Sequence, residues 1–151
     1  MNEAWLILVA FGSGFLLAQL WKLVAGLISG YRTHEIIDFK TGVGYFTRSG
    51  GMPSGHAASF TAATVLIGCM YGFDSGLFML AVCMWAIVAY DAMHVRYAVG
   101  IQGKALNGLL KQAKKPELPI TEGHTLSQVL TGTLLGVAIG VGIYWLTQGM
   151  A

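Results

Sequence analysis

The sequence predicts an all-α integral membrane protein, a helical bundle of about four transmembrane helices with an additional interfacial amphipathic helix. Three observations lead to this prediction. Hydrophobic residues make up 55% of the 151 residues and charged residues only 11%, whereas about a quarter of an ordinary soluble domain is charged. The apolar residues gather in four long runs, and the 21 glycines suit closely packed membrane helices. A chain of this length is expected to form a single domain over residues 1–151.

Each of the four apolar runs comes close to the roughly 20 residues that an α-helix needs to cross a bilayer. No basic residues precede the first run, so it is expected to be a retained helix and not a cleaved signal peptide. The second run is the shortest. The predicted spans cover about Ala4–Ser29, Ala57–Phe73, Gly76–Val95 and Ser127–Thr147.

The basic residues are expected to lie on one side of the membrane. All nine lysines and arginines fall in the first and third connectors, or at helix ends that face them. The second connector has only the charge of Asp74, and the C-terminal tail has no charged side chain. By the positive-inside rule the basic side is cytoplasmic and both termini lie on the other side. In a bacterium the membrane would be the inner membrane.

The third connector is expected to begin as a helix, because its apolar residues recur at helical spacing and its lysines lie off that stripe. Two interpretations remain open: an interfacial helix on an anionic lipid surface, or a helix with a solvated basic face. Pro116 and Pro119 end the helix. The stripe consists of Ala105, Leu106, Leu109, Leu110 and Ala113, and the lysines are Lys104, Lys111, Lys114 and Lys115.

The last apolar run carries a row of small residues. Gly132, Gly136 and Gly140 recur every four residues, which lets a second helix approach closely. The row lies in the middle of a helix, so it is not a nucleotide loop, and no nucleic-acid partner is expected. The helix that packs on it belongs either to the same chain or to a second copy in a homodimer.

The first of three motifs that combine ionisable residues with helix ends is GGMPSGH, residues 50–56. Pro53 and Ser54 mark a helix start with Ser54 as the N-cap, and the free N–H groups of the first turn form an anion site. Gly55 lets an anion approach the backbone. His56, beside that anion, could donate a proton to a leaving oxygen. The alternative is a capped turn with an incidental histidine.

The second motif, GHTLSQVLTG, places His124 directly before a membrane helix. A neutral imidazole can attack phosphorus when a partner orients its other ring nitrogen, so His124 is a candidate nucleophile. Gln128 has a structural alternative, because Thr125 and Gln128 fit a Thr-x-x-Gln capping box.

The third motif is DAMHVRYAVGIQ, residues 91–102. Asp91 ends an apolar helix, where a carboxylate is energetically costly and therefore indicates a function. It could pair with His94, three residues on, or orient His124 across the site. Arg96 can bind phosphate oxygens in bidentate fashion.

Together the three motifs resemble the type 2 phosphatidic acid phosphatase superfamily. The resemblance is greatest to its divergent branch of small membrane proteins related to acid phosphatases and vanadium-dependent haloperoxidases. It rests on GGMPSGH, DAMHVRYAVGIQ and EGHTLSQV in that order, and covers nearly the whole chain. It implies a membrane phosphatase without metal or cofactor, which hydrolyses a lipid phosphate or diphosphate through a phosphohistidine. A non-catalytic lipid-phosphate binder or carrier is the alternative.

The resemblance also implies roles for individual residues. His56 protonates the leaving group, Ser54 and Gly55 contact the phosphate, and Arg96 binds it. The candidates for the basic residues of the superfamily's first motif are Lys22, Lys40 and Arg48.

One motif of this chain departs from the superfamily pattern. The residue at the expected position of the nucleophile is Gln102, which cannot attack phosphorus, and the missing half resembles the later GHTLSQVLTG. The motif is therefore interpreted as split by the basic connector, with His124 as the nucleophile and Gln128 in the place of the orienting aspartate. An amide can hold a ring nitrogen, but it cannot stabilise an imidazolium as a carboxylate does. Asp91 or Glu122 could supply the carboxylate that stabilises the imidazolium instead.

Overall fold

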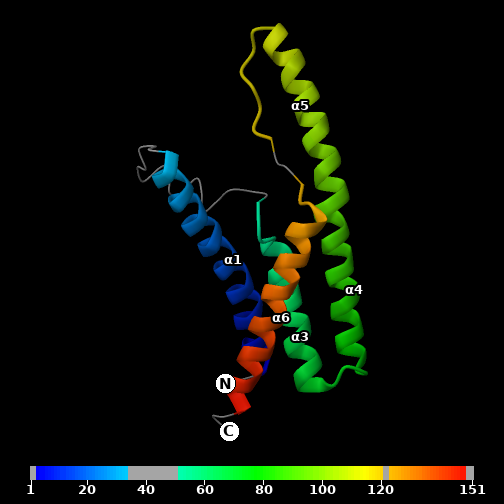
Figure 1. Ribbon diagram of the computed structural model, residues 1–151. Coiled ribbons are helices and arrows are strands. Elements are labelled where there is room, and N and C mark those ends of the chain that lie inside the picture. Colours follow the sequence, from blue (N-terminus) through cyan, green and yellow to red (C-terminus); the bar gives the residue numbers. More distant parts are fainter. Residues whose placement is uncertain (1–2, 34–50, 121–122, 149–151) are drawn as a thin grey trace.

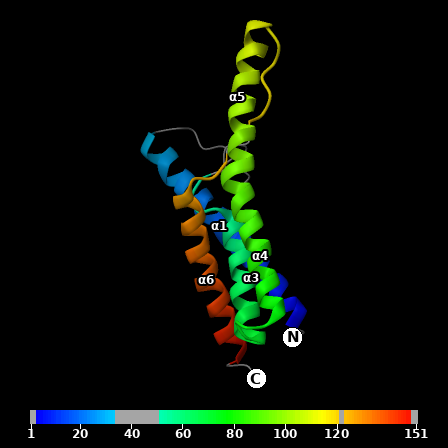
Figure 2. The same cartoon turned by 90° about the vertical axis from the view of Figure 1, so that its right-hand side faces the viewer.

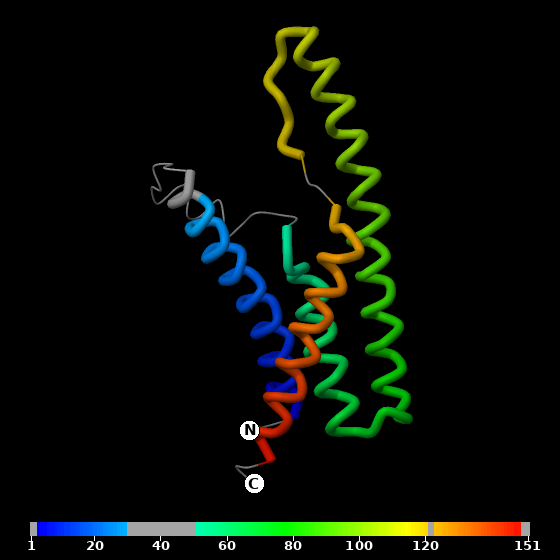
Figure 3. Tube along the Cα trace, viewed as in Figure 1, coloured from blue at the N-terminus to red at the C-terminus, as the bar shows by residue number. Residues whose placement is uncertain are grey.

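A computed structural model describes residues 3–33, 51–120 and 123–148 of the chain. The regular structure of these residues is entirely helical, as predicted (Figure 1). The start of α1 and the end of α6 lie at the same end of the bundle, which Figure 3 shows most clearly. The helices are α1 (Glu3–Thr33), α3 (Gly55–Tyr71), α4 (Gly76–Tyr90), the π-helical turn η1 (Asp91–Val95), α5 (Arg96–Gln112) and α6 (Leu126–Gln148).

The protein is an integral membrane protein. Among the described residues, three helices are long and apolar enough to cross a bilayer, over Glu3–Ser29, Gly76–Gln112 and Leu126–Gln148. Large apolar side chains cover their outer faces, and Trp21 and Trp145 are 62% and 71% exposed. A contiguous apolar surface of this kind suits contact with lipid and not with water.

The second predicted span corresponds to α3, which has only 17 residues and so lies at the lower limit for a crossing helix. This helix lies at the centre of the bundle, in contact with α1, α4 and α6 (Figure 2). A Cβ atom at Gly14 of α1 would lie 2.7 Å from the Ala58 carbonyl oxygen, and a Cβ atom at Gly136 of α6 would lie 2.6 Å from the same atom. Glycines on both neighbours therefore let their backbones reach α3.

The glycine row of α6 packs on α3 along its whole length. Gly132, Gly136 and Gly140 are buried, and their Cβ positions would overlap the carbonyl oxygens of Ser54, Ala58 and Ala62. This face is therefore occupied within the chain. Of the two alternatives, packing within the chain is the one that the structure shows, and a homodimer remains a prediction.

The helices α4, η1 and α5 form one continuous rod of 37 residues. At 1.5 Å per residue the rod is about 55 Å long, whereas the hydrocarbon core of a bilayer is about 30 Å thick. Accordingly α5 projects beyond the other helices (Figures 1 and 2). The helix predicted in the third connector is present, but it continues the axis of α4 and does not turn across the end of the bundle. The π-turn maintains the helical path from Tyr90 to Arg96, so nothing breaks the rod there.

The chain returns from the tip of α5 alongside that helix and is held there by a buried side chain. The amide nitrogen of Asn107 donates to the Leu118 carbonyl oxygen at 2.8 Å. The Leu118 N–H donates in turn to Asn107 Oδ1 at 2.8 Å. One turn earlier on α5, a Cβ atom at Gly103 would lie 3.5 Å from the Ile120 side chain. These contacts guide the connector back toward the start of α6.

Replacing Asn107 with leucine is expected to release the connector from α5. Both backbone groups of Leu118 lose their partner, and each hydrogen bond contributes about 1 kcal/mol, so amide exchange at Leu118 should accelerate about tenfold or more. Hydrogen–deuterium exchange of the purified protein measures this change. The control is Gln112→Leu, which removes an exposed amide from the same helix. Equal exchange at Leu118 in both variants would refute the clamp.

Candidate functional site

The three motifs meet at the end of the bundle from which α5 projects. The Ser54 N–H donates to the Gln128 carbonyl oxygen at 3.0 Å, which joins the start of α3 to the first turn of α6. The His124 N–H donates to the Ala92 carbonyl oxygen at 2.8 Å, which joins the same region to η1. Backbone bonds therefore fix the motifs relative to one another, although they are far apart in the sequence.

The start of α3 has the predicted form. Ser54 is the N-cap, and its Oγ accepts the Ala57 N–H at 3.4 Å. Gly55 and His56 are the first two residues of the helix. The N–H groups of a first helical turn have no partner inside the helix, so this end of α3 presents donors to an anion.

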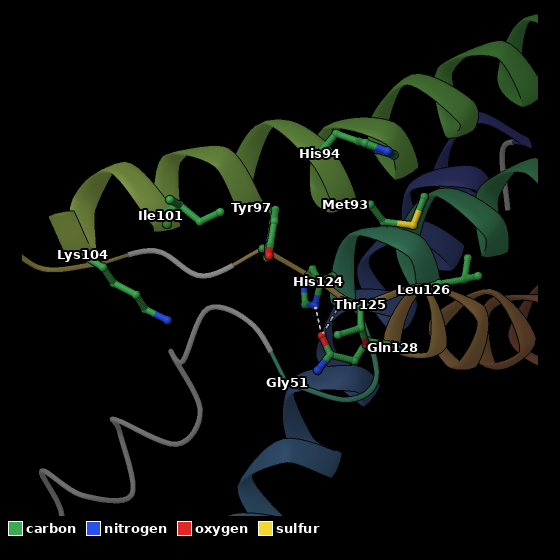
Figure 4. A pocket seen from close by; sticks show the side chains of 12 residues that line it. Gly51, Met93, His94, Tyr97, Ile101, Lys104, His124, Thr125, Leu126 and Gln128 are labelled. Atoms are coloured by element: carbon green, nitrogen blue, oxygen red, sulfur yellow. Dashed lines mark hydrogen bonds between the residues drawn. The ribbon is translucent and has the colours of Figure 1, made fainter.

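The imidazole of His124 is held by Gln128. Its Nδ1 lies 3.0 Å from Gln128 Oε1, and the same oxygen accepts the Thr125 N–H at 3.2 Å (Figure 4). The Thr125 bond fixes the orientation of the amide, because an NH₂ group in that place would face another donor. An amide oxygen only accepts, so Nδ1 of His124 carries the proton and Nε2 keeps its lone pair. This is the tautomer in which Nε2 can act as a nucleophile.

The predicted capping box is also present. Thr125 Oγ1 accepts the Gln128 N–H at 3.4 Å, while Gln128 Oε1 accepts the Thr125 N–H. The two interpretations of Gln128 are therefore compatible, because one oxygen atom caps α6 and contacts His124.

Asp91 lies at the site with a different partner from those predicted. Its Oδ2 accepts the Nε–H of Arg96 at 2.9 Å. Among the described residues this is the bond that the structure gives Asp91, in place of the expected pairing with His94 or contact with His124. His94 stacks on Tyr90 with ring centroids 4.3 Å apart. The bond to Asp91 uses Nε of Arg96, and the two terminal nitrogens take no part in it.

The pKa of His124, which precedes α6, is lowered from its ordinary value. Burial is the main cause, and the positive charges of Lys22 and Arg96 act in the same direction. The Gln128 side chain and the Gly51 backbone oppose this lowering. His124 is only 7% exposed. At neutral pH the imidazole is therefore neutral.

The pKa of His56, which precedes the apolar run of α3, is lowered as well. Burial is again the largest cause, followed by the charges of Arg96, His124 and Lys22, while Asp91 acts in the opposite direction. Contacts between the segments that carry these groups agree with this, since backbone bonds join Ser54 to Gln128 and His124 to Ala92, and the Gln19 side chain of α1 lies against Gly55. His56, His124, Arg96 and Lys22 therefore form one cluster, which we call the histidine site.

Gln19 of α1 lies beside Gly55, at the start of α3, and was not among the residues predicted from the sequence. Its side chain is 7% exposed, and its Oε1 lies 3.9 Å from the position of a Cβ atom at Gly55. The available signal was a polar residue inside an apolar run, three positions before Lys22.

A cavity of about 740 Å³ opens beside His124 (Figure 4). One wall is a face of the rod around η1 and α5, and the other is the start of α6 with the residues before it. Its lining residues are Gly51, Met93, His94, Tyr97, Gly100, Ile101, Lys104, Gly123, His124, Thr125, Leu126 and Gln128.

The described structure does not place four of the predicted site residues at the histidine site. Gln102 is exposed on α5 and does not line the cavity. Lys40, Arg48 and Glu122 lie outside the described residues.

Two comparisons relate the chain to known proteins. Residues 2–139 match the Divergent PAP2 family. The uncharacterized membrane protein YuiD of Bacillus subtilis (strain 168) is 26% identical over 82% of this chain and 89% of that protein. No solved structure shows a significant match.

Proposed function

The chain belongs to the Divergent PAP2 family, and from this premise we propose that it is a membrane phosphatase that hydrolyses a lipid phosphate or diphosphate through a phosphohistidine at His124. The observation that carries the proposal is the bond between His124 Nδ1 and Gln128 Oε1. It leaves the lone pair on Nε2, in a site that also holds a second histidine and an arginine.

In the first step Nε2 of His124 attacks the phosphorus atom, and the bond from phosphorus to the leaving oxygen breaks with its electron pair on that oxygen. His56 donates a proton to this oxygen. Burial and the positive charges of Arg96, His124 and Lys22 lower the pKa of free His56, and the negative charge of a bound phosphate dianion raises it again. His56 therefore takes up its proton together with the substrate.

In the second step a water molecule attacks the phosphohistidine. His56, now neutral, accepts a proton from the water, the bond from phosphorus to Nε2 breaks, and phosphate leaves. Both histidines return to their starting forms, and neither step requires a metal ion or a cofactor.

The phosphoryl oxygens bind to the basic side chains and to the start of α3. Stabilising this charge is the main electrostatic requirement of phosphoryl transfer. The terminal nitrogens of Arg96 and the N–H groups after Ser54 supply donors, and Lys22 adds a positive charge. Asp91 then has a positioning role, since it holds the guanidinium of Arg96 through Nε. Lys40 and Arg48 remain candidates for the same task.

We also propose that the histidine site faces the cytoplasm, since the site lies at the end of the bundle where the basic residues of the described structure gather. The site lies at the membrane surface, so a lipid can present its head group there while its tail remains in the bilayer.

The test of the proposed function is phosphate release from a panel of lipid phosphates that includes phosphatidic acid, phosphatidylglycerol phosphate and polyprenyl phosphates. Wild-type protein is compared with His56→Ala and His124→Ala. Release that depends on both histidines would support the proposal. Equal release by all three proteins would refute the site.

Gln128 favours a second candidate function, a non-catalytic binder or carrier of lipid phosphates. Its amide orients His124 but does not neutralise an imidazolium. Vesicle binding that depends on phosphate head groups, without any release of phosphate, would support this alternative. A phosphohistidine trapped at residue 124 would exclude it.

The pH dependence of kcat/KM tests the role of Gln128. His124 must be neutral to attack, and its pKa is lowered, so the acidic limb of the wild-type profile should lie below pH 6.5, the ordinary value for histidine. Gln128→Glu keeps an oxygen beside Nδ1 and adds a negative charge, which should raise the pKa of His124 and move the limb upward by about one pH unit. Gln128→Leu is the matched variant without an acceptor. A limb at the same pH in the glutamate variant would contradict this role.

A further inference from the structure

The cavity beside His124 follows one face of α5 and reaches a lysine. From the rod it is lined by His94 and by a row of five residues, which are Met93, Tyr97, Gly100, Ile101 and Lys104. The last four of this row follow Met93 by four, seven, eight and eleven positions, so the row lies on one helix face. We propose that Lys104 forms a second anion subsite, which selects substrates whose head group carries a second phosphoryl group. The proposal rests on the proposed function and specifies the substrate class of the same site.

Lys104 lies at a suitable distance from the nucleophile. A Cβ atom at Gly123 would lie 2.8 Å from the Tyr97 Cα, so His124, the next residue, lies beside the turn of α5 that contains Tyr97. Lys104 follows Tyr97 by seven residues, which is about 10 Å along a helix axis. A single phosphoryl group at His124 is therefore remote from the backbone of Lys104.

The side chain of Lys104 shortens this distance. Long side chains on a helix point back toward its N-terminus, which here is the direction of His124. Figure 4 shows the Lys104 side chain leaving α5 on the side of the cavity and pointing toward the end that holds His124. The ammonium group thus comes within range of a second phosphoryl group that is linked to one bound at His124.

The charge and shape of the cavity suit such a head group. Lys104 is the one lysine or arginine among the described residues that line it. Met93, Ile101 and Leu126 make part of the wall apolar, which strengthens the attraction between an ammonium and an anion. Gly100 adds no side chain in the middle of the lining face.

The test compares two substrates with the same tail, farnesyl phosphate and farnesyl diphosphate. Lys104→Gln is expected to lower kcat/KM for the diphosphate by about tenfold or more, since a charge-assisted hydrogen bond contributes about 1.5–3 kcal/mol. The monophosphate should change by less than about twofold. Lys104→Arg should restore most of the difference. The matched control is Lys111→Gln, which removes the same charge from α5 outside the cavity lining. Equal losses on both substrates, or an equal effect of Lys111→Gln, would overturn the proposal.

A binding measurement separates this inference from the proposed function. Isothermal titration of the wild-type protein with inorganic diphosphate should give an affinity about tenfold higher than with inorganic phosphate, and Lys104→Gln should remove the difference. This result would support the subsite even in a protein that releases no phosphate, in which case only the proposed function would fail. Equal affinities for the two anions in the wild-type protein would overturn the subsite, whatever the activity.

Discussion

Replacing His124 with alanine is expected to lower phosphate release by about a thousandfold or more, the scale seen when a catalytic nucleophile is removed. The variant loses the Nε2 lone pair that the Gln128 bond preserves. The cap of α6 should persist, because it depends on Thr125 and Gln128 and not on the imidazole. The loss should therefore be one of chemistry and not of folding.

Covalent trapping distinguishes the nucleophile from a residue that only supports the fold. Wild-type protein mixed with a ³²P-labelled lipid phosphate and quenched in alkali should carry the label at residue 124, and His124→Ala should carry none. Thr147→Ala is a control on the same helix, since its hydroxyl donates to the Tyr144 carbonyl oxygen at 2.8 Å near the other end of α6. Label on the His124→Ala protein would assign the nucleophile elsewhere and refute the proposed mechanism.

The parts of the site that depend on short-range signals could be predicted from the sequence. Ser54 caps α3 and Thr125 forms a capping box with Gln128, as predicted, because each cap involves residues no more than three positions apart. The apolar runs likewise mark the helices, since lipid-facing segments must be apolar along their length.

The pairing of Asp91 could not be predicted, because it depends on the π-turn. Residues five apart on a regular α-helix point about 140° away from each other, so the sequence favoured His94, three positions on, as a partner. In η1 the Arg96 N–H donates to the Asp91 carbonyl oxygen five residues back, which is the π pattern. The extra residue in this turn brings the side chains of Asp91 and Arg96 onto the same face.

Contacts between distant segments were also beyond the sequence. Nothing local shows that Asn107 will bind Leu118, or that Gln19 will face Gly55, because packing between segments decides both.

The helix that packs on the glycine row, in contrast, could have been predicted from the sequence. Ser54, Ala58 and Ala62 repeat small residues on α3 at the same four-residue spacing as the glycines of α6. Two complementary rows of small residues favour packing within the chain.

Replacing Gly132 with alanine is expected to disrupt both the fold and the histidine site. A Cβ atom at this position would overlap the Ser54 carbonyl oxygen and lie 3.1 Å from the Ala57 Cβ. The nearest obstacle is backbone, so α3 and α6 must move apart. Overpacking of this kind costs about 1–3 kcal/mol, and the unfolding temperature in detergent should fall accordingly.

The same displacement should reduce activity more than stability, because Gly132 lies next to the bond that joins the two halves of the site. Moving α6 away from α3 lengthens the contact between the Ser54 N–H and the Gln128 carbonyl oxygen, now 3.0 Å. Gln128 holds His124, while Ser54 precedes Gly55 and His56, so the nucleophile and the proton donor would shift relative to each other. A shift of about 1 Å can lower a rate about a hundredfold. We therefore expect phosphate release to fall by about that factor at temperatures where the variant is still folded.

Gly142→Ala provides the matched control, because the same methyl group is added to the same helix at a position with nothing within 4 Å. Alanine favours a helix over glycine by about 1 kcal/mol, so this variant should unfold at an equal or higher temperature and keep its activity. The two substitutions are identical in chemistry and differ only in what lies opposite the new atom. If the unfolding temperature falls in Gly132→Ala and rises in Gly142→Ala, the loss is attributable to the contact of Gly132 with α3. Equal stability and activity in the two variants would show that the approach of α6 to Ser54 does not determine the geometry of the site.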